Sequence, residues 1–236
     1  MSLTESLAAG PAEPLVRDLT IGDALRQAAA VDPGHTALIA GTPNPAGRRQ
    51  WTYGELLAQS EQVARALLAR FEPGERVAVW APNIPEWVMM EYGCAMAGVI
   101  LVTVNPSYQA EELAYVLNQS GAAGIFLLPE FRGNPMIGHL EQARADCPQL
   151  REVVLFTEWD NFLADADPIQ ALPEVTPGDA CMIQYTSGTT GFPKGALLHH
   201  RGLVNNGDHT AAINGFPAVS YTHLRAHETN DLISYA

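Results

Sequence analysis

The chain has 236 residues, of which 47% are hydrophobic and 17% are charged. This composition is typical of a globular protein, since disordered chains have fewer apolar and more charged residues, and the length allows one or two domains. Asp and Glu number 26 against 13 Lys and Arg, which gives a formal net charge of −13. Because phosphodiester backbones and anionic lipids repel such an acidic chain, we expect no nucleic-acid partner.

The three cysteines, Cys94, Cys147 and Cys181, lie far apart and have no CxxC or Cys/His spacing typical of zinc ligands. We therefore expect no disulfide framework, no metal site and a reducing, cytoplasmic setting. The N-terminus lacks the basic start and the apolar run of a secretion signal. The most apolar stretch, Tyr92–Val104, is too short to span a bilayer, so we expect no transmembrane segment.

Helix signals recur along the first half of the chain. Thr20 begins a Thr-x-x-Asp pattern, which predicts a helix that ends near Val31. A capping box at 52–55 precedes an amphipathic pattern and predicts a second helix to about Phe71. A third helix is expected over 85–97, where proline occupies the first turn and glycine follows the last residue.

Short apolar runs alternate with these helices. They predict strands at 35–40, 76–80, 99–104, 125–128 and 153–156, and further helices at 110–119 and 138–147. Strands of almost purely apolar residues are typical of a sheet that is covered on both faces. The alternation therefore predicts an α/β fold with helices on both sides of one sheet.

The most informative segment, Met182–Gly195 (MIQYTSGTTGFPKG), predicts a strand, a loop rich in glycine and hydroxyl groups, and a second strand. Gly188 and Gly191 permit positive φ, so backbone N–H groups can turn toward one point. Lys194, the only lysine of the chain, adds a compact positive charge. This composition favours a polyphosphate site. Its candidate residues are Thr186, Ser187, Gly188, Thr189, Thr190, Gly191, Phe192, Pro193 and Lys194.

Other phosphate and catalytic loops do not match this segment. A Walker A loop needs Gly directly before Lys and Ser or Thr after it, whereas Pro193 precedes Lys194 and Gly195 follows it. A dinucleotide Gly-x-Gly-x-x-Gly and a Gly-x-Ser-x-Gly nucleophile elbow are also absent. The remaining alternative is a polar hairpin loop without a ligand, which the agreement of strand, loop, lysine and following strand disfavours.

Tyr185–Gly195 (YTSGTTGFPKG) resembles the phosphate-binding signature of the adenylate-forming enzymes, a family of acyl-CoA synthetases, luciferases and peptide-synthetase adenylation domains. Further segments resemble the family in the right order: Trp51–Leu56, Arg76–Asn83, Ala97–Pro106 and Leu197–Asn206. Asn105–Tyr108 (NPSY) is similar to the acyl-CoA synthetase branch. The resemblance covers about residues 18–216.

The resemblance implies a three-layer sheet-and-helix fold, the N-terminal portion of an adenylate-forming enzyme, here incomplete. It implies a two-step ligase, in which ATP and a small carboxylic acid, such as a fatty acid, give an acyl-adenylate and pyrophosphate before coenzyme A takes the acyl group. Residues Thr186 to Lys194 would hold the β- and γ-phosphates, which Mg²⁺ would bridge. The family's catalytic lysine lies in a later segment, and Lys194 is not that lysine, so the catalytic residue is unknown.

The resemblance also divides the chain into a flexible arm at 1–17, a partial AMP-binding domain at 18–217 and a tail at 218–236. Within the tail, Val219–Thr229 (VSYTHLRAHET) is similar to a translated sequencing-adapter read-through, so we expect it to be foreign or disordered. A natural, divergent end is the alternative. The expected function is a fragment of an ATP-dependent acyl-CoA synthetase that is inactive alone, and the alternative is a non-catalytic nucleotide- or phosphate-binding module.

Overall fold

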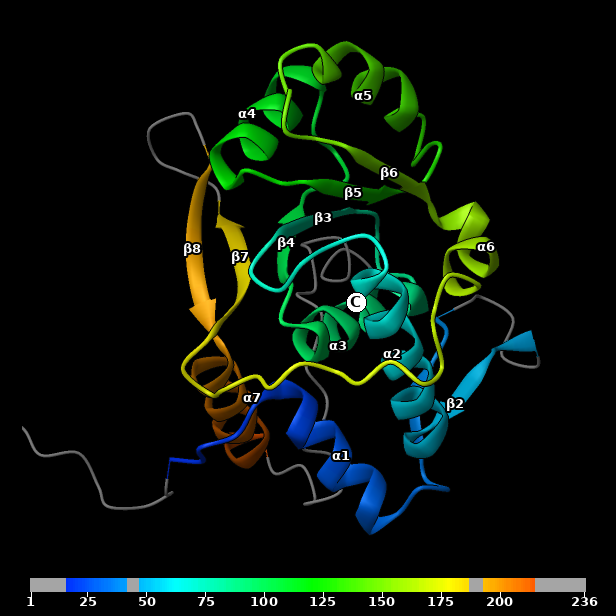
Figure 1. Ribbon diagram of the computed structural model, residues 1–236, viewed down its shortest axis with the longest axis vertical. Helices are drawn as coiled ribbons and strands as arrows, with labels where there is room; N and C mark the ends of the chain where they lie inside the picture. Colours follow the sequence, from blue (N-terminus) through cyan, green and yellow to red (C-terminus); the bar gives the residue numbers. More distant parts are fainter. Residues whose placement is uncertain (1–15, 42–46, 187–192, 215–236) are drawn as a thin grey trace, which may run out of the picture.

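The computed structural model describes residues 16–41, 47–186 and 193–214. At its centre lies a sheet of six strands (Figure 1). These are β3 (Arg76–Trp80), β4 (Ile100–Val104), β5 (Gly124–Leu127), β6 (Glu152–Leu155), β7 (Ala180–Thr186) and β8 (Lys194–His199). Their order in the sheet is β6-β5-β3-β4-β7-β8. The first five strands in this order are mutually parallel, and β8 is antiparallel to β7. The short strands β1 (Thr36–Ile39) and β2 (Gln50–Thr52) form a separate antiparallel pair.

Helices cover both faces of the sheet, which confirms the expected three-layer α/β fold (Figure 1). They are α1 (Ile21–Val31), α2 (Tyr53–Leu68), α3 (Pro85–Ala97), α4 (Ala110–Ser120), α5 (Met136–Arg144), α6 (Trp159–Leu163) and α7 (His200–Ile213), with a 3₁₀ turn at Phe156–Glu158. In Figure 1, α4 and α5 lie above the sheet, and α2 and α3 lie below it. None of the described helices is long and apolar enough to cross a membrane.

The two-residue period of the strands divides the core into two halves. In β3, Val77 and Val79 belong to the apolar cluster formed with α1, α2 and α3, whereas Ala78 and Trp80 belong to the cluster formed with α4 and α5. All four of these residues are fully buried. Successive side chains of a strand point to opposite faces, so a strand with helices on both sides must be apolar at every position.

The predicted starts of α1 and α2 and the glycine stop of α3 are confirmed. The Thr20 hydroxyl accepts a hydrogen bond from the Asp23 N–H at 3.0 Å, and Thr52 and Glu55 form a reciprocal capping box at 3.2 and 2.9 Å. Gly98 ends α3 with a φ of 67°, a left-handed conformation that glycine adopts without a steric cost. Local sequence therefore determines where α1 and α2 begin and where α3 ends.

Two short elements have no counterpart among the predicted ones. The strand β2 has three residues and α6 has five, and neither length carries a readable period. Aromatic packing holds α6 in place, since the Phe162 ring lies edge-on to Phe126 at 4.8 Å and 5.3 Å from the Trp159 ring. In addition, α2 ends at Leu68, three residues before the predicted Phe71, and α5 spans Met136–Arg144 instead of the predicted 138–147.

Glu91 of α3 is a carboxyl group inside the core. It is 6% exposed, and its Oε2 atom has no hydrogen-bond partner among the described residues. Burial raises the pKa of Glu91 to about 7, because removal from water disfavours the charged form. The unfolded chain ionises this group near its ordinary value of 4.5. Stability is therefore lost as the pH rises from about 4.5 to 7.

We predict that Glu91→Gln stabilises the protein in a pH-dependent way. At pH 4 both states of the wild type are protonated, and the variant should show little change in the free energy of unfolding. At pH 8 the variant avoids burying a charge and should gain about 2–3 kcal/mol. Urea denaturation at the two pH values measures the difference. The exposed control Glu111→Gln should gain nothing at either pH, and an equal gain in both variants would contradict the assignment.

Candidate phosphate-binding hairpin

The two ends of the predicted phosphate loop meet in the hairpin of β7 and β8. Thr186 is the last residue of β7, Lys194 is the first of β8, and the two residues pair across the ladder. The Thr186 hydroxyl donates to the Lys194 carbonyl oxygen at 3.5 Å. Of the nine predicted site residues, Thr186, Pro193 and Lys194 are described, and Ser187–Phe192 lie outside the described residues. The hairpin therefore fixes both ends of the loop at one place.

This place is the carboxyl edge of the parallel strands. β7 runs parallel to β4, with Leu101 opposite Met182 and Val102 opposite Ile183, so Thr186 lies at the same edge as the segment that follows Val104. Open α/β sheets bind ligands outside the carboxyl ends of their strands. Thr186 and Lys194 are both exposed there, so a ligand can reach the hydroxyl group and the ammonium group.

The hairpin separates from the rest of the sheet at Thr103. The ladder between β4 and β7 ends at the pair Val102 and Ile183, although β7 continues to Thr186. At this fork the Thr103 hydroxyl donates to the Ile183 carbonyl at 3.5 Å and accepts from the Tyr185 N–H at 3.3 Å. One side-chain hydroxyl thus takes over from the backbone ladder where the two strands diverge.

Tyr185 anchors the stem of the hairpin to α4. A Cβ atom on Gly195 would lie 3.1 Å from the Tyr185 ring and 2.9 Å from Ile183, so the absence of a side chain on Gly195 leaves room for this packing. The Tyr185 hydroxyl donates to the Val116 carbonyl of α4 at 3.4 Å. Burial raises the pKa of Tyr185 from 10 to about 12, so the phenol keeps its proton, and with it this donor, in alkaline solution as well as at neutral pH.

A pocket of about 380 Å³ lies at the same edge of the sheet, between the segments that follow β4 and β5. The Asn134 amide joins its two walls, because it donates to the Pro106 carbonyl at 2.8 Å and to the Tyr108 carbonyl at 3.2 Å. The pocket is lined by Pro106, Ser107, Gln109, Phe131, Arg132, Gly133, Asn134, Pro135 and His139. Most of these residues are polar or charged, so the pocket suits a polar ligand.

The paired histidines at the far end of β8 have structural roles. His199 Nδ1 accepts the Gly202 N–H at 3.0 Å and caps α7, while His200 Nδ1 accepts the Ile21 N–H at 3.3 Å. Burial lowers the pKa of His200 to about 4, so this acceptor stays neutral. No group of three or more His, Cys, Asp and Glu side chains is arranged to hold a metal ion within the described ranges.

Residues 25–227 match the family of AMP-binding enzymes. The chain belongs to this family. It is 32% identical over 216 residues to an acyl-CoA ligase, SID4, of Ajellomyces capsulatus, a match that covers 84% of this chain and 36% of the relative. It is 30% identical over 237 residues to the mitochondrial medium-chain acyl-CoA ligase ACSF2 of Rattus norvegicus, covering 87% of this chain and 37% of the relative. The chain thus spans less than two-fifths of these relatives' length.

Most of this member of the AMP-binding family superposes on a solved structure. The inhibitor-bound N-terminal domain of FACL13 from Mycobacterium tuberculosis superposes with a TM-score of 0.71 at 28% identity, covering 82% of this chain and 47% of that one. The expected family and fold class are therefore confirmed, and so is the expectation that the chain corresponds to an N-terminal part of its relatives.

Sequence reasoning found the ends of the loop but missed the residues that support them. Thr103 lies inside an apolar strand, where a threonine carries no signal of its own, and its role depends on the fork between β4 and β7. Tyr185 belongs to the quoted motif, and its contact with α4 is a long-range one. The pocket combines two segments, of which only Asn105–Tyr108 had been singled out.

We predict that Thr103→Val destabilises the hairpin although it keeps the shape of the side chain. The change removes both hydroxyl contacts and leaves the Tyr185 N–H without its acceptor, which costs about 1–2 kcal/mol of unfolding free energy. Urea denaturation measures this loss, and amide hydrogen exchange should become faster at Tyr185. Tyr185→Phe, which removes only the contact with Val116, serves as the comparison and should cost less. An amide hydrogen-exchange rate at Tyr185 that is the same in Thr103→Val as in the wild type would contradict the role of Thr103.

Proposed function

We propose that this chain forms part of an ATP-dependent acyl-CoA synthetase and supplies the phosphate-binding loop of its adenylation site. The observation that carries the proposal is the closure of the hairpin at Thr186 and Lys194 on the carboxyl edge of the sheet. Membership of the AMP-binding family and the similarity to two acyl-CoA ligases support the reaction class. The acid is a small-molecule carboxylate, such as a fatty acid.

In this mechanism the loop Thr186–Lys194 binds the β- and γ-phosphates of ATP. The Lys194 ammonium offsets the negative charge that collects on the departing pyrophosphate. The Thr186 hydroxyl exchanges its 3.5 Å contact with the Lys194 carbonyl for a hydrogen bond to a phosphate oxygen. Mg²⁺, bound together with the nucleotide, would supply part of the charge that neutralises the phosphates. The hairpin contributes a fixed geometry, because Thr103 and Tyr185 tie its stem to β4 and α4.

Coenzyme A is the proposed acyl acceptor. Its phosphate groups need polar and cationic partners, and the pocket at the same edge of the sheet offers the Arg132 guanidinium with the side chains of Ser107 and Gln109. Free, buried thiols at Cys94, Cys147 and Cys181 support a reducing compartment such as the cytoplasm for the reaction.

We predict that Lys194→Ala weakens the binding of Mg²⁺-pyrophosphate far more than it weakens folding. Loss of a charged phosphate contact costs about 1.5–3 kcal/mol of binding free energy, whereas an exposed substitution changes stability by about 0.5 kcal/mol or less. Isothermal titration calorimetry measures the first effect and thermal unfolding the second. Arg144→Ala, which removes one positive charge from α5, is the control for net charge. Equal affinity of the Lys194 variant and the wild type would exclude the assigned role.

The alternative is a phosphate-binding module without catalysis. This alternative is favoured for the isolated chain because its only lysine, Lys194, is not the one that matches the family's catalytic lysine.

We predict that the 236-residue chain does not form acyl-adenylates. Aligning the α-phosphate with the carboxylate can contribute about 7–11 kcal/mol to lowering the barrier, and phosphate contacts alone do not supply this alignment. ATP–pyrophosphate exchange with a panel of fatty and aromatic acids tests the prediction. Carboxylate-dependent exchange above the no-enzyme control would show a complete site in this chain.

A further inference from the structure

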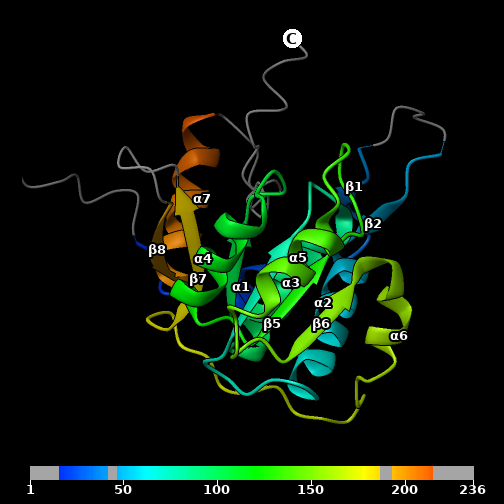
Figure 2. The ribbon, with the colours of Figure 1, turned by 90° about the horizontal axis from the view of Figure 1, so that it is seen from above.

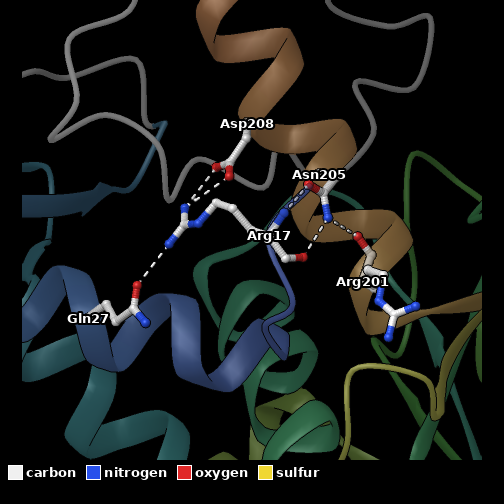
Figure 3. A network of polar contacts seen from close by, with 5 residues as sticks. All are labelled: Arg17, Gln27, Arg201, Asn205 and Asp208. Carbon is white, nitrogen blue, oxygen red and sulfur yellow. Dashed lines mark hydrogen bonds and ion pairs between the residues drawn. The ribbon is translucent and has the colours of Figure 1, made fainter. Parts of the chain in front are cut away.

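The segment before α1 is bound to α7 through its backbone (Figure 3). The Asn205 carboxamide accepts the Arg17 N–H through Oδ1 at 2.8 Å and donates through Nδ2 to the Arg17 carbonyl at 2.8 Å. A side-chain amide here makes the two hydrogen bonds that a neighbouring strand would make. Nδ2 also donates to the Arg201 carbonyl at 2.8 Å, which fixes the orientation of the amide.

The Arg17 side chain connects α7 with α1. Its guanidinium donates to both carboxylate oxygens of Asp208 in α7, at 2.9 and 3.2 Å, and to the Gln27 side chain of α1 at 2.8 Å (Figure 3). One residue later, Asp18 accepts from Arg201 of α7 at 2.7 Å. Arg17 is the last residue of the arm expected over 1–17, and its backbone and side chain are both engaged.

These contacts act on the helix that directly follows the phosphate-binding hairpin. Strand β8 begins at Lys194 and ends at His199, and α7 begins at His200 with no residue between them (Figure 2). β8 is the edge strand of the described sheet, and Lys194–Leu197 are exposed. Within the described part of the chain, the position of β8 therefore depends on its ladder with β7 and on the helix at its end.

We propose that Arg17 is a positioning residue for the phosphate-binding hairpin. It holds α7 against α1, and α7 in turn holds the strand that carries Lys194. The inference rests on the proposed phosphate-binding function and adds to it a contact that lies 188 positions away from its partner in the sequence. Asn205 recognises the backbone of the segment, whereas Asp208 and Gln27 select arginine at this position.

The experiment compares four variants of the 236-residue chain: Arg17→Ala, Asp208→Ala, the charge-exchanged double variant R17D/D208R, and Arg151→Ala. Arg151 is the matched control, because it forms a two-bond ion pair with Glu75 at 2.8 and 2.6 Å on another part of the molecule. Amide hydrogen exchange follows the opening of α7, and calorimetry follows the binding of Mg²⁺-pyrophosphate well below the thermal midpoint. At that temperature a loss of affinity cannot come from global unfolding.

Partly exposed ion pairs contribute little to global stability, so the expected effect is local. Arg17→Ala and Asp208→Ala should speed exchange in α7 by about 3- to 10-fold and weaken pyrophosphate binding by a similar factor. The charge-exchanged variant should recover most of both, and Arg151→Ala should match the wild type in both.

Three results would overturn the proposal. Unchanged exchange in α7 would show that Arg17 does not hold the helix, and faster exchange with unchanged affinity would show that the helix does not position Lys194. An equal loss of affinity in Arg151→Ala would show a general effect of lost charge. A wild-type chain that binds no pyrophosphate would refute the proposed function itself, and the exchange data would then decide separately whether Arg17 holds α7.

Discussion

Burial of both faces of the parallel strands is the constraint on which the rest of the structure depends. Val79 and Ala78 are neighbours in β3, face opposite sides of the sheet, and are both fully buried. A strand in this position needs a helical layer on each side, and the crossovers provide it, α3 on one face and α4 with α5 on the other. Parallel strands joined in this way bring their carboxyl ends to a single edge. The candidate hairpin and the polar pocket both lie at this edge.

Signals of short range were enough to predict most of this framework. Thr20, the capping box at 52–55 and Gly98 each act within one helical turn, and the continuous apolar runs of β3 and β4 already indicate burial on two faces. What sequence reasoning missed depends on partners distant in the chain. The helix α6 is held in place by the contact of Phe162 with Phe126. Thr103 bonds the backbone of β7 only because β7 diverges from β4 at this residue. Neither circumstance leaves a pattern in the residues themselves.

Two buried ionisable groups among the described residues, His200 and Glu91, show how burial in the core affects charge. His200 and Glu91 are each more than nine-tenths buried, and burial shifts each pKa toward the neutral form, to about 4 and about 7. For His200 the unfolded state takes up the proton first, so stability falls as the pH drops from about 6.5 to 4. For Glu91 stability falls as the pH rises from about 4.5 to 7. The two effects oppose each other across the range from about 4.5 to 6.5, so removal of either group exposes the pH dependence of the other.

The element that follows the loop bears on how the proposed phosphate site would attract an anion. In phosphate sites built on a helix N-terminus, the helix dipole and several free N–H groups attract the anion. Here the chain returns as the strand β8, and the next helix, α7, begins only at His200, at the opposite end of that strand. Strand dipoles largely cancel, so the sheet supplies little field of its own. In a chain with a formal net charge of −13, the proposed site would have to attract a polyphosphate with charge from within the loop. In that proposal Lys194, the first residue of β8, would supply the charge, and Thr186 pairs with it across the ladder.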